Sequence, residues 1–451
     1  MEERSVAFVT LGCKLNYSES SAIARDFAAR GYRIVNVAEN PGIIVVNTCS
    51  VTAHADKKCR NIIRRLHQRF PSAKIAVTGC YAQLNPDVLA AIEGVVAVVG
   101  TRDKGDLCRI VDSAPARALH AFRAVPAPFA PRAASAAPAD STAPSAVLKY
   151  PCNADDVTSV FPAYSAGERT RSFLKVQDGC DFRCSYCTVP IARGHSRNVP
   201  ISTLVEQARE IAASGVCEIV LTGVNTGDFG RTTGESFLDL LKALDKVKGI
   251  SRYRISSIEP NLLGEEIVDW IAAGGKFLPH FHIPLQSGCD RILAAMRRRY
   301  TTAQFESKIN YVRDAMESPQ ERYTKVFFGI DVIVGFPGES DADFATTYSF
   351  LERIRPAFLH VFPYSRRPGT PAADMPCQVE DGVKGERVAA LEALSARLHD
   401  DFCRANRGRR ARVLFESREK SGMMTGYTEN YIRVSRPFEP DAIGRITELE
   451  I

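Results

Sequence analysis

The stretch "SFLKVQDGCDFRCSYC" (Ser172–Cys187) runs from an apolar strand into three closely spaced cysteines, Cys180, Cys184 and Cys187. A disulfide uses two cysteines and a structural zinc site uses four ligands, so three thiols match neither. The C-x3-C-x2-C spacing can wrap one loop around a soft metal centre, and thiolates select iron–sulfur clusters or zinc. A [4Fe–4S] cluster held by three cysteines keeps one iron open. The residues alone also allow a zinc site with a distant fourth ligand, or thiols without metal.

Strand and helix patterns alternate on the C-terminal side of this strand. The first strand is followed by helical patterns such as 203–214 and 237–247, and by five more apolar runs, "CEIVLTG", "RYRISSI", "PHFHIPL", "VFFGIDVIVG" and "AFLHVFPY". Six strand–helix units predict a barrel or partial (β/α) barrel, which we assign to residues 166–402. The chemistry of such a barrel lies on the loops after the carboxyl ends of its strands, where the three cysteines stand.

The first hundred residues repeat the alternation on a smaller scale. Short β-branched runs at 6–11, 43–47, 74–79 and 94–100 are separated by helical patterns, of which the clearest are 18–30 and 56–70. This spacing predicts a doubly wound α/β domain with a parallel sheet, which we assign to residues 1–112.

Three further cysteines, Cys13, Cys49 and Cys80, each follow a different one of these N-terminal strands. The carboxyl ends of parallel strands converge on one crevice, so these thiols are expected to be neighbours in space. One buried cysteine is ordinary packing, but three at strand ends are harder to explain in that way. We interpret them as ligands of a second [4Fe–4S] cluster, again with an open iron. The other seven cysteines are interpreted as buried or incidental.

The remaining segments differ in composition. Residues 113–165 form a linker or excursion, because 113–145 is mostly Ala, Pro and Ser. Residues 403–451 contain short strands separated by Gly and polar turns, which predicts a small C-terminal β-barrel. The chain has 451 residues, 13 cysteines and a net charge of +6, without a signal peptide pattern or a long apolar run. These features predict a cytoplasmic protein with reduced thiols and no membrane segment, and they permit a polyanionic partner.

The cysteine loop after the first barrel strand resembles the radical S-adenosylmethionine enzymes. That resemblance implies a [4Fe–4S] cluster whose open iron binds S-adenosylmethionine and cleaves it reductively to a 5′-deoxyadenosyl radical. It also implies that residues on the cysteine loop and at later strand ends contact the cofactor. The matching positions here are Phe182, Thr222, Gly223, Ser257, Glu259, Gln286 and Ser287.

The whole chain resembles the methylthiotransferase family, which joins a three-cysteine domain, a radical barrel and a C-terminal TRAM domain that binds RNA. The resemblance implies two [4Fe–4S] clusters and two uses of S-adenosylmethionine, as radical source and as methyl donor. The barrel cluster would start hydrogen abstraction. The cluster of Cys13, Cys49 and Cys80 would hold the sulfur species that is methylated and inserted.

The stretches "TLGCKLNYSES" (Thr10–Ser20) and "PYSRRPGTPAADM" (Pro363–Met375) are similar to the branch that acts on N6-threonylcarbamoyladenosine at tRNA position 37. The implied partners are the tRNA anticodon stem-loop and a low-potential electron donor such as flavodoxin or ferredoxin; the sulfur source stays open. One alternative is a branch acting on isopentenyladenosine 37, whose motif begins like "GCQMN", or on a ribosomal-protein aspartate, with "GCPKN". An alternative from another class is a non-catalytic iron–sulfur or zinc protein that binds RNA.

Basic stretches offer phosphate contacts. They lie at 57–69, 297–300 and 404–413, and Tyr427 and Tyr431 are candidates for stacking on single-stranded bases. A charged helix face is usually only solvated, which we take as the better interpretation for 57–69. The segment 404–413 leads into the small β-domain, and there we expect RNA contact.

Overall fold

The computed structural model describes residues 4–114, 147–150, 152–167, 170–317, 324–418 and 422–451. The Ala/Pro-rich segment falls almost wholly outside these residues. The chain forms two compact units. The first comprises Met1–Gly12, Ile23–Ser50 and His54–Cys152, and the second comprises Cys13–Ala22, Val51–Ala53 and Asn153–Ile451. No helix in the described ranges combines the length and the apolar character that crossing a membrane requires.

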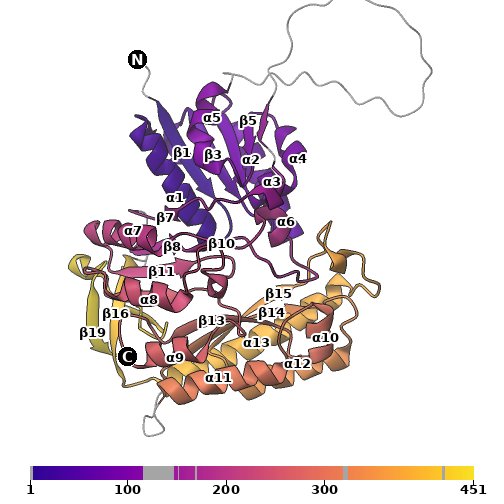
Figure 1. Cartoon of the computed structure of the whole chain (residues 1–451), viewed down its shortest axis with the longest axis vertical. Coiled ribbons are helices and arrows are strands. Elements are labelled where there is room, and N and C mark those ends of the chain that lie inside the picture. The colour runs from indigo at the N-terminus through magenta and orange to yellow at the C-terminus, as the bar shows by residue number, and fades with distance from the viewer. Residues whose placement is uncertain (1–3, 115–146, 151, 168–169, 318–323, 419–421) are drawn as a thin grey trace, which may run out of the picture. The chain divides into compact units, whose positions relative to one another are not determined.

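The first unit is built on a parallel sheet with the strand order β2-β1-β3-β4-β5-β6 (Figure 1). The strands are β1 (Ser5–Thr10), β2 (Arg33–Ile34), β3 (Ile43–Thr48), β4 (Lys74–Gly79), β5 (Val95–Val99) and β6 (Leu148–Tyr150). Every residue of β3 and β5 is buried, as expected for parallel strands covered on both faces. The predicted doubly wound sheet is confirmed. The short strand β6 was not predicted, and it lies inside the segment interpreted as a linker.

Helices alternate with the strands along the chain of the first unit, as the sequence pattern predicted. They are α1 (Lys14–Ala29), α2 (Ala53–Arg69), α3 (Cys80–Leu84), α4 (Pro86–Ala90) and α5 (Leu107–Ser113). Helix α2 illustrates how such a helix packs on the sheet. Its residues Cys59, Ile63 and Leu66 recur at helical spacing and are buried against side chains of β3 and β4. Its opposite face carries the basic residues.

The second unit contains six parallel strands in the order in which they occur along the chain. They are β8 (Arg171–Lys175), β11 (Glu218–Thr222), β12 (Arg252–Ile255), β13 (His280–Gln286), β14 (Phe327–Val334) and β15 (Phe358–Pro363). Between β12 and β13 the described residues form only isolated parallel bridges, which join Tyr253 to Phe277 before β13 and Ser257 after β12 to His282. The short strand β7 (Ala163–Tyr164) pairs antiparallel with β8 at one edge. The arrangement is therefore an open, partial barrel, as predicted.

Helices cover the outer face of this barrel, and Figure 1 shows α11, α12 and α13 running beneath β13, β14 and β15. Outward apolar residues such as Ile283, Ile330 and Leu359 join helix residues such as Phe305 and Leu391 in one core. The helices are α6 (Val189–Arg193), α7 (Ile201–Ala213), α8 (Phe237–Asp245), α9 (Glu265–Ala272), α10 (Asp290–Ala295), α11 (Thr302–Met316), α12 (Asp341–Ile354) and α13 (Asp381–Ala405). The opposite face of the strands is left for polar residues.

The last part of the second unit is a four-stranded antiparallel sheet with the order β18-β17-β16-β19. Its strands are β16 (Arg410–Arg418), β17 (Met423–Tyr427), β18 (Arg433–Pro437) and β19 (Ile446–Glu450). The predicted small β-barrel thus takes the form of a curled half-barrel. Guanidinium groups anchor it to the barrel: Arg254 donates to the Thr428 carbonyl oxygen at 2.8 Å, and Arg252 donates to the Arg412 carbonyl oxygen at 3.1 Å.

A buried ion cluster sits at this junction. The Glu218 carboxylate is 1% exposed and pairs with Arg254 at 2.8 Å and with Arg252 at 3.1 Å. Arg171 lies 3.8 Å from Glu218 and also pairs with Glu416. Burial alone would raise the pKa of Glu218, but Arg254 and Arg252 hold it below the usual glutamate range. The carboxylate is therefore ionised inside the fold.

Candidate metal centre

The loop that carries Cys180, Cys184 and Cys187 is closed at its neck. Strand β9 (Gln177–Asp178) pairs antiparallel with β10 (Arg197–Asn198), so both ends of the loop are fixed side by side. Gly179 has a φ of 72°, and a Cβ at this position would overlap the His195 carbonyl oxygen. Only glycine allows this close approach. The Cys180 amide then donates to the Gly194 carbonyl oxygen at 3.0 Å.

Each of the three sulfur atoms receives a hydrogen-bond donor. The Phe182 amide lies 3.4 Å from the Cys180 sulfur, and the Val189 amide lies 3.4 Å from the Cys187 sulfur. The Arg298 guanidinium lies 3.2 Å from the Cys184 sulfur. Donors aimed at sulfur stabilise thiolates, as a metal ligand requires.

Burial opposes the ionisation of these thiols in the absence of a metal. Burial, with a contribution from neighbouring Cys184, raises the pKa of both Cys180 and Cys187 to about 12. Three adjacent thiolates are therefore unstable without a bound cation. Together with the three donors, this soft set of ligands fits an iron–sulfur cluster well.

Arg298 was missed by sequence analysis, which interpreted 297–300 as an RNA-binding patch. The structure corrects this for Arg298, whose side chain is 3% exposed and forms an ion pair with Glu259. Burial raises the pKa of Glu259, and the Arg298 charge opposes that rise. The pair joins the loop after β12 to the cysteine loop. No feature of a single sequence distinguishes Arg298 from its exposed neighbour Arg297.

The predicted cofactor residues lie where expected along the chain, and several have structural partners. Thr222 ends β11 and is buried, with Gly223 directly after it. The Ser257 carbonyl oxygen accepts from the Thr226 hydroxyl at 2.8 Å. Gln286 ends β13 with a φ of 69°, and the buried Ser287 hydroxyl lies 3.2 Å from the Cys289 amide. The Ser287 side chain is thus engaged in the turn after β13.

Phe182 and Gln177 shape the same region. The Phe182 side chain is buried, and the Arg299 guanidinium lies 4.0 Å from the centre of its ring. Gln177, which sequence analysis did not single out, accepts from the Val224 and Asn225 amides at 3.0 and 2.9 Å. It therefore ties the loop after β11 to the neck of the cysteine loop.

A second buried ion cluster stands beside this neck, and it too was missed. Lys175 pairs with Glu19 at 2.7 Å and with Asp178 at 2.6 Å, and all three side chains are at most 2% exposed. Arg193 reaches Glu19 at 3.1 Å and donates to the Asn16 side-chain oxygen at 2.9 Å. The first turns of α1, which directly follow Cys13, are thereby joined to the barrel.

The N-terminal cysteines follow three adjacent strands. Cys49 and Cys80 come directly after Thr48 and Gly79, which are register partners of β3 and β4. Gly79 has a φ of 98°, and a Cβ there would overlap the Thr48 carbonyl oxygen, so the strands approach closely at this point. Cys13 comes three residues after the end of β1, which pairs with β3 on its other side. In the order β2-β1-β3, the site between β1 and β3 is the switch point where such sheets bind ligands.

Polar residues occupy the inner face of β13, β14 and β15. His282 Nε2 lies 2.6 Å from Asp331 Oδ1, and the His282 and His360 rings stack with their centres 4.8 Å apart. One nitrogen or oxygen atom from each of His282, Asp331 and His360, here called the lumen triad, lies within 4.8 Å of the others. Burial lowers the pKa of His360, and His282 lowers it further.

Lys14 lies in the first turn of α1 and is partly buried. Burial lowers the pKa of Lys14 to about 8, with contributions from Arg171 and Arg254, while Asp331 opposes the shift. Sequence analysis used Lys14 only as part of a motif.

The candidate RNA contacts divide into two kinds. Arg407 and Arg410 are exposed, whereas Arg409 is 13% exposed and pairs with Glu429 at 3.5 Å. The Tyr431 ring stacks on Tyr427 and lies 4.9 Å below the Arg254 guanidinium. These protein contacts occupy the Tyr431 ring, so the expectation that it stacks on a base is corrected.

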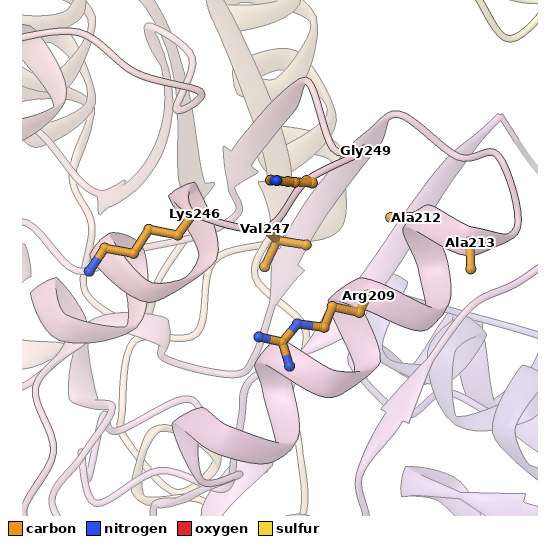
Figure 2. A pocket seen from close by; sticks show the side chains of 7 residues that line it. Arg209, Ala212, Ala213, Lys246, Val247 and Gly249 are labelled. Atoms are coloured by element: carbon orange, nitrogen blue, oxygen red, sulfur yellow. The ribbon is translucent and has the colours of Figure 1, made fainter.

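A shallow pocket of about 600 Å³ lies at the C-terminal ends of α7 and α8 (Figure 2). Arg209, Lys246, Val247 and Gly249 are among the residues that line it. These helix ends precede the first residues of β11 and β12, so the pocket is at the opposite end of those strands from the cysteine loop. It contributes nothing to the candidate metal centre.

Comparison with known proteins identifies two matching families. A model described as uncharacterized protein family UPF0004 matches residues 5–100, and the radical SAM superfamily model matches residues 174–351. The solved structure of the radical S-adenosylmethionine methyltransferase TsrM from Kitasatospora setae, with cobalamin and a [4Fe-4S] cluster bound, has a TM-score of 0.55 and 16% identity. The alignment covers 82% of this chain and 74% of TsrM. At that identity the likeness concerns the fold, and it confirms the predicted barrel class.

Full-length relatives are more informative. The chain is 37% identical to threonylcarbamoyladenosine tRNA methylthiotransferase MtaB of Bacillus subtilis (strain 168), over 99% of this chain and 93% of that protein. Identity to the MtaB protein of Aquifex aeolicus (strain VF5) is 35%, over 96% of each chain. Identity to tRNA-2-methylthio-N(6)-dimethylallyladenosine synthase of Syntrophotalea carbinolica is 32%, over 99% of this chain and 97% of that protein.

Proposed function

The chain belongs to the radical S-adenosylmethionine tRNA methylthiotransferases, and we propose that it converts N6-threonylcarbamoyladenosine at tRNA position 37 into its 2-methylthio derivative. The threonylcarbamoyladenosine branch is favoured because two MtaB proteins are 37% and 35% identical to the chain, whereas a dimethylallyladenosine synthase of comparable coverage is 32% identical. The observation that carries the catalytic assignment is the three-cysteine loop, in which every sulfur receives a donor.

When bound, a [4Fe–4S] cluster with S-adenosylmethionine supplies a radical able to take hydrogen from an unactivated C–H bond. Cys180, Cys184 and Cys187 would hold that cluster. The Phe182 and Val189 amides and the Arg298 guanidinium would stabilise the negative charge on sulfur. Around the cluster, the residues that we assign to S-adenosylmethionine are Phe182, Thr222, Gly223, Ser257, Glu259, Gln286 and Ser287.

Cys13, Cys49 and Cys80 would supply the second iron–sulfur site. Cys49 and Cys80 follow register partners of adjacent strands, and Cys13 follows the next strand across, at the switch point of the sheet. We assign these three cysteines to a second [4Fe–4S] cluster that holds the sulfur to be inserted. A second S-adenosylmethionine would provide the methyl group.

The partners follow from the reaction. The substrate is tRNA, and the adenosine lies in the anticodon loop, where a modified base can leave the stack. Reductive cleavage of the cofactor needs a low-potential electron donor such as flavodoxin or ferredoxin. Exposed Arg407, just before β16, and exposed Arg410, the first residue of β16, would contact the phosphates.

The decisive experiment is nucleoside mass spectrometry of tRNA from cells with and without the gene. Loss of 2-methylthio-N6-threonylcarbamoyladenosine, with accumulation of its precursor lacking the methylthio group, is the expected result. Loss of the methylthio group from isopentenyladenosine instead would move the enzyme to the other branch. Unchanged levels of both nucleosides would contradict the proposed substrate.

A further inference from the structure

Three adjacent strands bring two histidines and one aspartate together on the inner face of the barrel. His282 is on β13, Asp331 is on β14 and His360 is on β15. Asp331 and His360 are register partners, so their side chains leave neighbouring strands side by side. Successive residues of a strand point to opposite faces, and the apolar residues next to the triad belong to the core that the helices cover. The lumen triad therefore projects away from that core.

A glycine on the middle strand gives the two imidazole rings room to approach each other. Gly329 is the register partner of His282 on one side and of Phe358 on the other. A Cβ at Gly329 would lie 3.8 Å from His360 Nε2, so the His360 ring leans over the glycine. The His282 and His360 rings stack with their centres 4.8 Å apart and 28° between their planes. Glycine at this position thus lets both rings lie beside Asp331.

The spacing of the three ligand atoms suits a small metal ion. His282 Nε2 lies 2.6 Å from Asp331 Oδ1, and one nitrogen or oxygen atom from each member of the triad lies within 4.8 Å of the others. Nitrogen and oxygen ligands at about 2.0–2.2 Å from a tetrahedral ion are about 3.3–3.6 Å from one another, which falls between these two values. Small rotations of the side chains would therefore place all three atoms around one ion.

The kinds of donor atom indicate the class of ion. Imidazole nitrogen together with carboxylate oxygen suits divalent transition metals such as Zn²⁺ and Fe²⁺, whereas Ca²⁺ and Mg²⁺ prefer oxygen ligands alone. Among the described residues, His360 makes ring contacts and no hydrogen bond, so neither of its nitrogens is engaged. Burial lowers the pKa of His360, and the ring is therefore neutral near pH 7, the form that binds a metal ion.

We propose that His282, Asp331 and His360 bind a divalent transition-metal ion, separate from the iron–sulfur clusters. Three protein ligands leave a coordination position open, as in catalytic zinc sites, and a water molecule or an oxygen atom of a substrate can occupy it. The inference does not depend on the proposed substrate, because binding of the metal is measured without tRNA.

The test measures Zn²⁺ binding by the full-length enzyme with its iron–sulfur clusters reconstituted. The protein is dialysed without oxygen against buffered Zn²⁺, and zinc, iron and sulfide are then counted per chain. We expect wild type to bind one zinc ion. His282→Ala, Asp331→Ala and His360→Ala should each lower the affinity by more than about 100-fold, because even a residue that only supports a metal ligand contributes about 10- to 100-fold. Iron and sulfide should not change in these variants.

His67→Ala is the matched control for His282→Ala. The His67 side chain is 20% exposed and lies 3.6 Å from a Glu93 oxygen, while the His282 side chain is 22% exposed and pairs with Asp331. Among the described residues, His67 belongs to no group of three such ligands. The control variant should therefore bind zinc as wild type does.

X-ray absorption at the zinc edge identifies the ligands in wild type without any substitution. Nitrogen and oxygen neighbours at about 2.0–2.2 Å are expected, whereas zinc at a cysteine site would show sulfur at about 2.3 Å. A sulfur shell around the zinc would overturn the inference. So would zinc binding by wild type that is no tighter than binding by the three triad variants.

Discussion

The Arg298 guanidinium donates a hydrogen bond to the Cys184 sulfur at 3.2 Å and also pairs with Glu259. One buried cation thus neutralises a carboxylate on one strand-end loop and supports a cluster ligand on another. Its loss should affect both stability and cofactor chemistry.

Replacing Arg298 with Met should lower stability by about 3 kcal/mol, because Glu259 is left buried without its partner. Cleavage of S-adenosylmethionine should fall about 10- to 100-fold, as is typical when the partner of a metal ligand is removed. Urea unfolding and 5′-deoxyadenosine yield measure the two effects. Arg297→Met changes an exposed neighbour, so it should change neither the stability nor the yield of 5′-deoxyadenosine. Adding Glu259→Gln to Arg298→Met should recover part of the stability but not the cleavage; recovery of both would contradict a direct role at Cys184.

Gly179→Ala should prevent the neck of the cysteine loop from closing, because the added methyl group overlaps the His195 carbonyl oxygen. We expect iron content to fall by about four per chain, the size of one cubane cluster. Gly215→Ala is the matched control: its φ of 86° is similarly positive, but no atom lies within 4 Å of the added carbon. If both variants lose iron equally, backbone strain rather than the overlap at the neck is responsible.

The two cysteine sets should have separable roles. Alanine at Cys180, Cys184 and Cys187 should remove one cluster and abolish cleavage of S-adenosylmethionine. Alanine at Cys13, Cys49 and Cys80 should remove the other cluster, so that each triple variant keeps about four of about eight irons. The second variant should still cleave the cofactor while forming no methylthio product. Loss of cleavage in that variant would refute this division.

Glu218→Gln should cost about 3–5 kcal/mol, because Arg252 and Arg254 lose the charge that pairs with them. The pKa of Glu218 is lowered in the fold, so its contribution to stability is present above the unfolded pKa of about 4.3 and is lost as pH falls through the folded value. Unfolding free energy measured between about pH 3 and pH 6 should therefore decline more steeply with acid in wild type than in Glu218→Gln. Equal slopes would show that folding does not lower the pKa of Glu218.

Arg407 and Arg410 are expected to contact phosphate. Replacing both with Gln should weaken tRNA binding and reduce the slope of log K against log salt by about 0.7–0.9 for each phosphate that is no longer neutralised. Arg409→Gln serves as the comparison, because this side chain is 13% exposed and paired with Glu429. An unchanged salt slope in the double variant would show that Arg407 and Arg410 do not contact the tRNA phosphates.

The features that sequence analysis predicted correctly are those encoded locally. The β3 run of Ile and Val has the pattern of a buried parallel strand, and the same reasoning located the barrel strands. The cysteine loop has its ligand spacing within eight residues. Strand β6 was missed because only three residues form it, after a segment whose composition gives no indication of a return to the sheet.

The features that were missed depend on pairs far apart in the chain. Arg298 meets Cys184 across 114 positions, and Lys175 meets Glu19 across 156. A basic residue in a basic run is normally solvated, so the burial of Arg298 contradicts the local pattern. The contacts of Tyr431 were missed in a similar way. Its ring meets Arg254 and Tyr427 only when the half-barrel packs on the barrel strands, so no local pattern indicates that the ring is occupied.

Residues Cys13–Ala22 belong to the second unit, although the chain on both sides of them belongs to the first. Glu19 anchors this short insertion through Lys175 and Arg193. A gene fusion with one junction near residue 150 therefore could not exchange either unit intact between two members of the family. The transferred barrel would arrive without its own Glu19, and a foreign helix would have to match Lys175 and Arg193. Natural or engineered hybrids should consequently tolerate exchange only when Cys13–Ala22 travels with the barrel and Met1–Gly12 stays with the first unit.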